Sequence, residues 1–176
     1  MTTTDPRPPG TVATVVGFLV AGVLAGVAWA WLAEPLRYTV VRVDDRSGLS
    51  ADEVAASAAF GVLLTYVWVS ALAAALWSAF ATWRWGREGG TLVIVRTALG
   101  AAAAAFVAWG VGVLLGPPTP EVGSRPAGAE VSARLEIDAY GILLVWPVAA
   151  LLALILVAWL TLPREPAEEL RAVEHA

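Results

Sequence analysis

The sequence predicts an all-α membrane protein with four transmembrane helices. Three observations support this prediction: hydrophobic residues make up 59% of the 176 positions, charged residues make up only 15%, and the mean hydropathy is +0.72. Soluble domains are usually about half apolar, so this composition lies outside their range. Most residues fall into four long apolar blocks, which leaves too few for a separate soluble domain. We therefore expect a single helical bundle in lipid, covering residues 12–162.

The first apolar block follows a polar, proline-rich lead, residues 1–11, which we expect to be disordered. Residues 12–33 contain no charged side chain and would form about 33 Å of helix, enough to cross a hydrocarbon core of about 30 Å. A secretory signal peptide is the competing interpretation, because Ala28, Trp29 and Ala30 resemble a cleavage site. The apolar block is longer than the usual run of about 7 to 15 residues, which favours a retained helix.

Three further blocks predict the remaining spans, at about residues 58–82, 97–115 and 139–162. None of them contains Asp, Glu, Lys, Arg or His. Backbone polar groups at this depth must be satisfied within the segment, so α-helices are the only suitable form. A capping box from Ser50 to Glu53 indicates that the second helix begins outside the lipid.

Two individual residues, Pro147 and Arg96, carry their own predictions. Pro147 lies about a third of the way along the fourth span and should kink that helix. Arg96 immediately precedes the third span, and its long side chain should reach the lipid headgroups.

Two segments outside the spans are typical of β-strands. Val131, Ala133, Leu135 and Ile137 alternate with polar residues, and this period of two indicates a half-buried strand that leads into the fourth span. The segment from Arg37 to Val43 is rich in β-branched residues. The two segments belong to the first and third loops, which lie on the same side of the membrane. A small extracytoplasmic sheet above the bundle is therefore expected.

The orientation rests on arginine alone, because the chain contains no lysine. Arg84, Arg87 and Arg96 crowd one short loop that carries a single acid, Glu88. The positive-inside rule therefore predicts a multi-pass cell-membrane protein with both termini, including the tail at residues 163–176, in the cytoplasm. The tryptophans near the predicted membrane boundaries should form two interfacial belts. The outer belt would contain Trp29, Trp31, Trp109 and Trp146, and the inner belt Trp83, Trp85 and Trp159.

The composition excludes several classes of function. The chain has no Cys and one His, His175 in the tail, which rules out a Cys nucleophile, a Cys/His zinc cluster and cysteine-held iron–sulfur centres. The net charge of −4 and the absence of a basic run argue against nucleic acid as a partner. The acidic residues outside the spans match no catalytic spacing. We expect no enzyme activity, no cofactor and no bound metal.

Small residues recur at every fourth position along the third span, and a shorter version of the pattern occurs in the first. Such a stripe lets helix backbones approach closely in lipid. Two interpretations remain open: packing within this bundle, and a surface for a membrane-protein partner or a homodimer. The candidate residues for either role are Gly22, Gly26, Gly100, Ala104, Ala108, Gly112 and Gly116.

Three apolar segments resemble those of a known family. They are AWAWLA at residues 28–33, AAFVAWGVGVLLGP at residues 104–117 and GILLVWPVAAL at residues 141–151. Together they resemble an uncharacterised actinobacterial family of four-helix integral membrane proteins, a domain of unknown function. The resemblance covers almost the whole chain and implies the same topology with two outer loops. It implies no activity, cofactor or site residue.

The expected function is an accessory or interaction role in the cell envelope, with the lipid bilayer as the environment. A lone channel or ion carrier is disfavoured, because ion and proton paths usually need ionisable side chains within the spans. The alternative is a non-catalytic subunit of a membrane transporter.

Overall fold

The computed structural model describes residues 9–34, 37–43, 46–50, 53–86, 90–118, 126, 128–132, 134, 135, 137 and 139–161. Its helices are α1 (Pro9–Leu32), α2 (Glu53–Trp85), α3 (Gly90–Leu115) and α4 (Val145–Thr161), with a 3₁₀ helix, η2 (Tyr140–Leu144), directly before α4. Four helical segments in these ranges are long and apolar enough to cross a membrane, which confirms the predicted helical architecture. Residues 1–8 of the expected lead and the expected tail at 163–176 lie outside the described residues.

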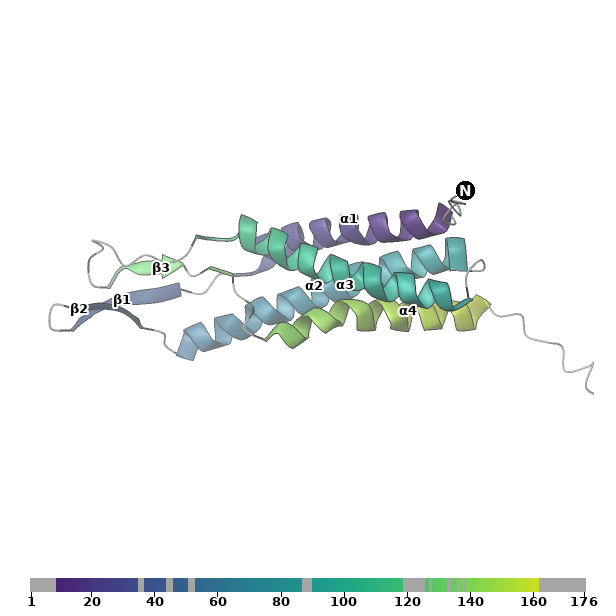
Figure 1. Cartoon of the computed structure of the whole chain (residues 1–176). Helices are drawn as coiled ribbons and strands as arrows, with labels where there is room; N and C mark the ends of the chain where they lie inside the picture. Colours follow the sequence, from purple (N-terminus) through teal and green to yellow (C-terminus); the bar gives the residue numbers. More distant parts are fainter. Residues whose placement is uncertain are drawn as a thin grey trace, which may run out of the picture.

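The four helices form an elongated bundle with a small sheet at one end (Figure 1). The start of α1 and the end of α4 lie at the opposite end. The most extensive helix contacts are between α1 and α3 and between α2 and α4, and the contacts of α1 with α2 and of α3 with α4 are smaller. Each helix therefore has its main partner two helices away along the chain.

Three of the four helices, α1, α2 and α3, extend beyond the apolar blocks that predicted them. α1 begins at Pro9, inside the expected disordered lead, where proline is well suited because the first residues of a helix need no N–H donor. α2 is 33 residues long and continues past residues 58–82 on both sides. α3 begins at Gly90 and includes Arg96. The predicted spans were limited to residues without charged side chains. The helices are longer because a helix can continue past the edge of the hydrocarbon layer.

Pro147 lies near the start of the α-helical part of the fourth span. α4 begins at Val145, so Pro147 is its third residue, and the N–H that proline lacks would have had no acceptor within the α-helix. The five residues before α4 form η2 instead. The fourth span is therefore η2 followed by α4 and not one α-helix over residues 139–162. The change of helix type occurs directly before the proline, and the kink at Pro147 stays a prediction.

The sheet joins the first and third loops, as the sequence predicted. It contains β1 (Arg37–Val43), β2 (Arg46–Ser50) and β3 (Glu130–Ser132), in the order β2-β1-β3 with antiparallel pairing throughout. In the register of β1 with β3, Tyr38 lies opposite Val131. The sheet end of the bundle is thus tied together by a pairing between segments about 90 residues apart.

The third strand differs from expectation. β3 has three residues rather than the expected run from 131 to 137, although Val131, Leu135 and Ile137 are all buried. The alternation therefore marks burial over the end of the bundle and not continuous pairing. Ser50 is the last residue of β2 and pairs with Thr39, and α2 is described from Glu53. Residues 51 and 52 of the expected capping box lie outside the described residues, so the capping role of Ser50 stays a prediction.

Candidate functional site

The predicted small-residue stripe lies where α1 meets α3. An added Cβ at Gly22 would lie 2.7 Å from the carbonyl oxygen of Ala104, and one at Gly26 would lie 2.5 Å from that of Ala108. No side chain larger than hydrogen fits in either position, so the two backbones are in direct contact. Such close approach increases dispersion between helices in lipid, where no hydrophobic force drives their association.

The three remaining glycines of the stripe accommodate side chains from elsewhere in the bundle. Gly100 packs against Phe18, whose Cδ2 would lie 2.8 Å from an added Cβ, and an added Cβ at Gly112 would overlap the ring of Trp29. Gly116 packs against Leu135, which follows the sheet. The structure thus places all seven predicted stripe residues in contacts within this chain.

The sequence pattern missed two glycines on a second face of α1. An added Cβ at Gly10 would lie 2.9 Å from Trp85, and one at Gly17 would overlap the ring of Trp77. Both tryptophans belong to α2, so α1 presents glycines to α2 as well as to α3. The spacing of small residues along one helix carries no signal for this arrangement, because the match is between a glycine and a large residue on another helix.

Trp29 and Tyr66 form the centre of the core near the sheet. Trp29 is fully buried, and its indole Nε1 donates a hydrogen bond of 3.0 Å to the carbonyl oxygen of Val62 in α2. Tyr66 donates its hydroxyl to the carbonyl oxygen of Ala105 in α3 at 3.1 Å. The two rings meet edge to face with centroids 5.1 Å apart. This aromatic pair therefore connects α1, α2 and α3.

A second set of interhelical hydrogen bonds lies farther from the sheet. Trp77 Nε1 donates to the carbonyl oxygen of Thr14 in α1 at 3.0 Å, and Ser78 Oγ donates to the carbonyl oxygen of Ala150 in α4 at 2.6 Å. Side-chain donors that reach backbone carbonyls across helices are worth about 0.6 to 2 kcal/mol each in membrane bundles. These contacts fix α2 against α1 and α4.

The burial of the tryptophans corrects part of the interfacial-belt prediction. Trp29 and Trp146 are fully buried, so they are core residues and do not form an outer belt. Trp31, Trp83 and Trp159 are exposed on the surface of the bundle, as interfacial residues would be. The buried and the exposed tryptophans both lie near the ends of predicted spans. Position in the sequence alone therefore could not distinguish core tryptophans from interfacial ones.

Arg96 is buried, contrary to the expectation that it reaches the headgroups. Its exposed fraction is 5%, and its Nη2 donates to the carbonyl oxygen of Trp85 at 3.2 Å, near the end of α2. Nη1 donates to Thr11 Oγ1 in the first turn of α1 at 3.4 Å. A cation is favourable beside the free carbonyls at a helix C-terminus. Arg96 therefore links three helices at the end opposite the sheet.

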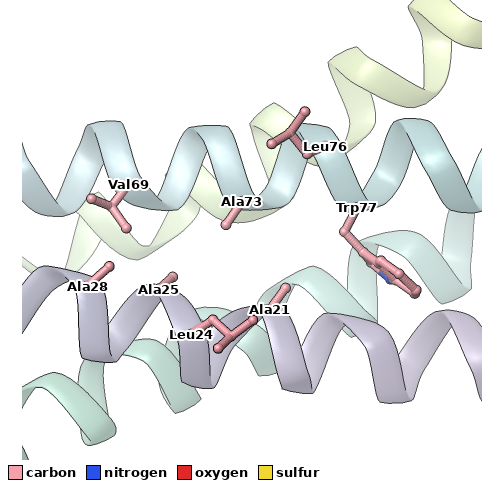
Figure 2. A pocket seen from close by; sticks show the side chains of 8 residues that line it. All are labelled: Ala21, Leu24, Ala25, Ala28, Val69, Ala73, Leu76 and Trp77. Atoms are coloured by element: carbon pink, nitrogen blue, oxygen red, sulfur yellow. The ribbon is translucent and has the colours of Figure 1, made fainter.

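An apolar groove lies on the side of the bundle between α1 and α2 and has a volume of about 450 Å³. Figure 2 shows that both helices contribute its walls. Ala25 is buried at its base, whereas Leu24 and Leu76 are more than half exposed at its edges. The complete lining consists of Ala21, Leu24, Ala25, Ala28, Val69, Ala73, Leu76 and Trp77.

The described residues contain little that could support chemistry. No group of three metal-ligand side chains occurs among them, and Arg96 is their only buried charged side chain. The arrangement defines a four-helix bundle of membrane-spanning length with a small sheet at one end. No family model, no curated protein and no solved structure matches the chain. The functional argument therefore rests on the geometry of the chain itself.

Substitution of Gly112 by Ala should destabilise the bundle far more than the same change at Gly110. At Gly112 a new methyl group would collide with the buried ring of Trp29, whereas an added Cβ at Gly110 meets nothing within 4 Å. We expect a loss of about 1 to 3 kcal/mol for Gly112→Ala, typical of overpacking, and little change for Gly110→Ala. Thermal unfolding in detergent measures both, and equal midpoints for the two variants would contradict this account of the seam.

Replacing Trp29 by Phe should cost more stability than replacing Trp146 by Phe. Both indoles are fully buried and lose the same volume, but Trp29 also loses its bond to Val62, whereas the Trp146 N–H forms no hydrogen bond of standard geometry among the described residues and approaches only the Tyr66 hydroxyl. The expected difference is about 1 kcal/mol, one interhelical hydrogen bond. Unfolding midpoints in the same detergent provide the comparison, and a larger loss for Trp146→Phe would refute it.

Proposed function

We propose that this chain is an accessory or interaction protein of the cell membrane, with no catalytic activity of its own, that associates laterally with another membrane protein. One observation carries the proposal: the interior of the bundle is filled by its own side chains. The buried donors of Trp29, Tyr66 and Ser78 are all used on backbone carbonyls of neighbouring helices. With its interior committed to packing, such a bundle acts through its outer surface.

The charge distribution also supports a non-conducting role. Ion and proton paths through membranes usually depend on carboxylates, His or Arg within the spans. Among the described residues the one buried charge, Arg96, lies near the end opposite the sheet and contacts the ends of α1 and α2. A transporter could still contain this chain as a non-catalytic subunit, in which case the partner supplies the path.

The proposed orientation places both chain ends in the cytoplasm and the sheet outside. Arg84 lies in the last turn of α2 and Arg96 near the start of α3, both at the end opposite the sheet. Cationic residues close to a membrane boundary favour the cytoplasmic side. This orientation makes the sheet an extracytoplasmic element.

Cysteine labelling tests this orientation without background, because the natural chain has no Cys. Ser132 in β3 and Thr91 in α3 are both exposed and lie toward opposite ends of the bundle. We expect a membrane-impermeant maleimide to label Ser132→Cys in intact cells and to label Thr91→Cys only after lysis. The reverse pattern would show that the sheet is cytoplasmic.

Photocrosslinking in native membranes tests the interaction role. Phe60 and Phe106 are 65% and 60% exposed, whereas Phe18 is fully buried, so benzoylphenylalanine can replace the same residue type in both environments. We expect a discrete crosslinked product with another membrane protein from Phe60 or Phe106, and only internal products from Phe18.

The identity of the crosslinked protein separates the two versions of the proposal. A transport protein would favour the transporter-subunit alternative, and a protein of envelope assembly would favour the accessory role. Absence of any intermolecular product from these two positions and from the exposed residues Leu72 and Leu152 would argue against lateral association.

A further inference from the structure

The fourth span contains a joint where its two helix types meet, at residues 143–147. The 3₁₀ helix η2 (Tyr140–Leu144) is followed directly by α4 (Val145–Thr161). Pro147 has no N–H, so the backbone hydrogen bond that would connect it to the carbonyl oxygen of Leu143 in a continuous α-helix cannot form. A 3₁₀ stretch inside a helical span often marks a hinge. The backbone of this joint therefore has one hydrogen bond fewer than a continuous α-helix would have.

Two contacts fix the chain on either side of the joint. On the sheet side, the ring of Tyr140 meets that of Trp109 in α3 edge to face, with centroids 6.3 Å apart. On the other side, the hydroxyl of Ser78 in α2 donates to the carbonyl oxygen of Ala150 at 2.6 Å. The joint and the first turn of α4 lie between these two contacts, so this turn can shift while both ends of the segment stay in place.

Trp146 carries the one polar side-chain group of the joint. The residue is fully buried, but its indole N–H forms no hydrogen bond of standard geometry among the described residues and approaches only the Tyr66 hydroxyl. A buried donor without a hydrogen bond costs free energy, and buried polar groups in folded proteins are nearly always bonded. A conformation that completed this bond would recover that free energy.

The acceptor is held by helices other than α4. Tyr66 in α2 donates its hydroxyl to the carbonyl oxygen of Ala105 in α3 at 3.1 Å, and its ring packs edge to face on Trp29 in α1. The hydroxyl oxygen has two lone pairs, which is enough to accept from both Ser70 and Trp146. A fixed acceptor therefore faces a donor on a segment with a weakened backbone connection.

We propose that the joint is a conformational device with two states. In the described state the Trp146 N–H only approaches Tyr66, and in the second state the first turn of α4 lies closer to α2 and the N–H donates to the Tyr66 hydroxyl. Leu144 and Val148 are exposed on the surface of the bundle and move with this turn. The lipid-facing surface at the sheet end of α4 (Figure 1) therefore differs between the states. The inference is independent of the proposed interaction role, because it concerns a motion within the chain.

Nuclear magnetic resonance of the indole N–H groups tests for the second state. The full-length protein with isotope-labelled tryptophan is placed in lipid nanodiscs, and the Trp146 signal is identified by its loss in Trp146→Phe. Shifts of helical segments occur in microseconds to milliseconds, so we expect relaxation dispersion or two exchanging signals for Trp146. Trp29 is the control in the same sample, because its buried N–H is already bonded to Val62 and should show neither. A single Trp146 signal with a flat profile, or equal dispersion for both indoles, would overturn the proposal.

Variants of the joint test whether the exchange arises from the proposed motion. Pro147→Ala supplies the missing N–H, so η2 and α4 can join as one α-helix, and the exchange at Trp146 should fall by about fivefold or more. Val148→Ala is the matched control in the same turn, because it shortens an exposed side chain and leaves the backbone donors unchanged. It should keep the exchange of the natural chain.

Tyr66→Phe removes the acceptor and should abolish the exchange at Trp146, because the second state then gains no hydrogen bond. Thermal unfolding in detergent establishes whether each variant is folded. Exchange that persists in both Pro147→Ala and Tyr66→Phe would refute the joint. If Tyr66→Phe does not fold, the comparison of Pro147→Ala with Val148→Ala decides, and equal exchange in these two variants would refute it.

Discussion

Close approach of α1 and α3 is the contact on which the rest of the bundle depends. Helices in lipid gain nothing from leaving water, so their association relies on dispersion and on hydrogen bonds, and both decrease steeply with distance. Gly22 and Gly26 remove the side chains that would separate α1 from the backbone of α3. At this separation the ring of Trp29 lies directly over Gly112 and its Nε1 reaches the carbonyl oxygen of Val62 on α2.

Tryptophans and glycines on facing helices act together in this bundle. Trp29 packs over Gly112 and Trp77 packs over Gly17. The indole of Trp29 donates a hydrogen bond to the carbonyl oxygen of Val62, and that of Trp77 donates one to the carbonyl oxygen of Thr14. Each glycine leaves space for an indole ring. The indole N–H then fixes the position of that ring, because a hydrogen bond requires alignment as well as proximity. A bundle held by packing alone could slide along its seams, whereas these bonds fix the level of one helix against the next.

The sequence was sufficient for the helices and for one strand, because these depend on local pattern. Uncharged blocks of membrane-spanning length predicted the helices, and the β-branched run predicted β1 with the observed bounds. β2, which contains Ser47 and Gly48, has no such run, and its pairing with β1 was missed. Period-two alternation near Leu135 correctly indicated burial but not strand pairing.

The contacts of the candidate functional site were harder to predict from the sequence than the fold. The stripe on α3 could be read from spacing along one helix, but its partner could not. The burial of Trp29, the contact of Trp77 with Gly17 and the groove beside it all depend on which helices become neighbours and at what level. That information arises only from the assembled bundle.

The order of contacts has a consequence for how the protein is made. α1 and α2 leave the ribosome before their principal partners, α3 and α4, exist. Until synthesis has passed α3, Gly22, Gly26 and the ring of Trp29 lack the α3 backbone against which they pack, and the pairing of β1 with β3 waits longer still. The first two helices therefore enter the membrane before the bundle can form. During this time the incomplete chain exposes the glycine face of α1, which later packs on α3, to lipid and to the cell's quality-control proteases.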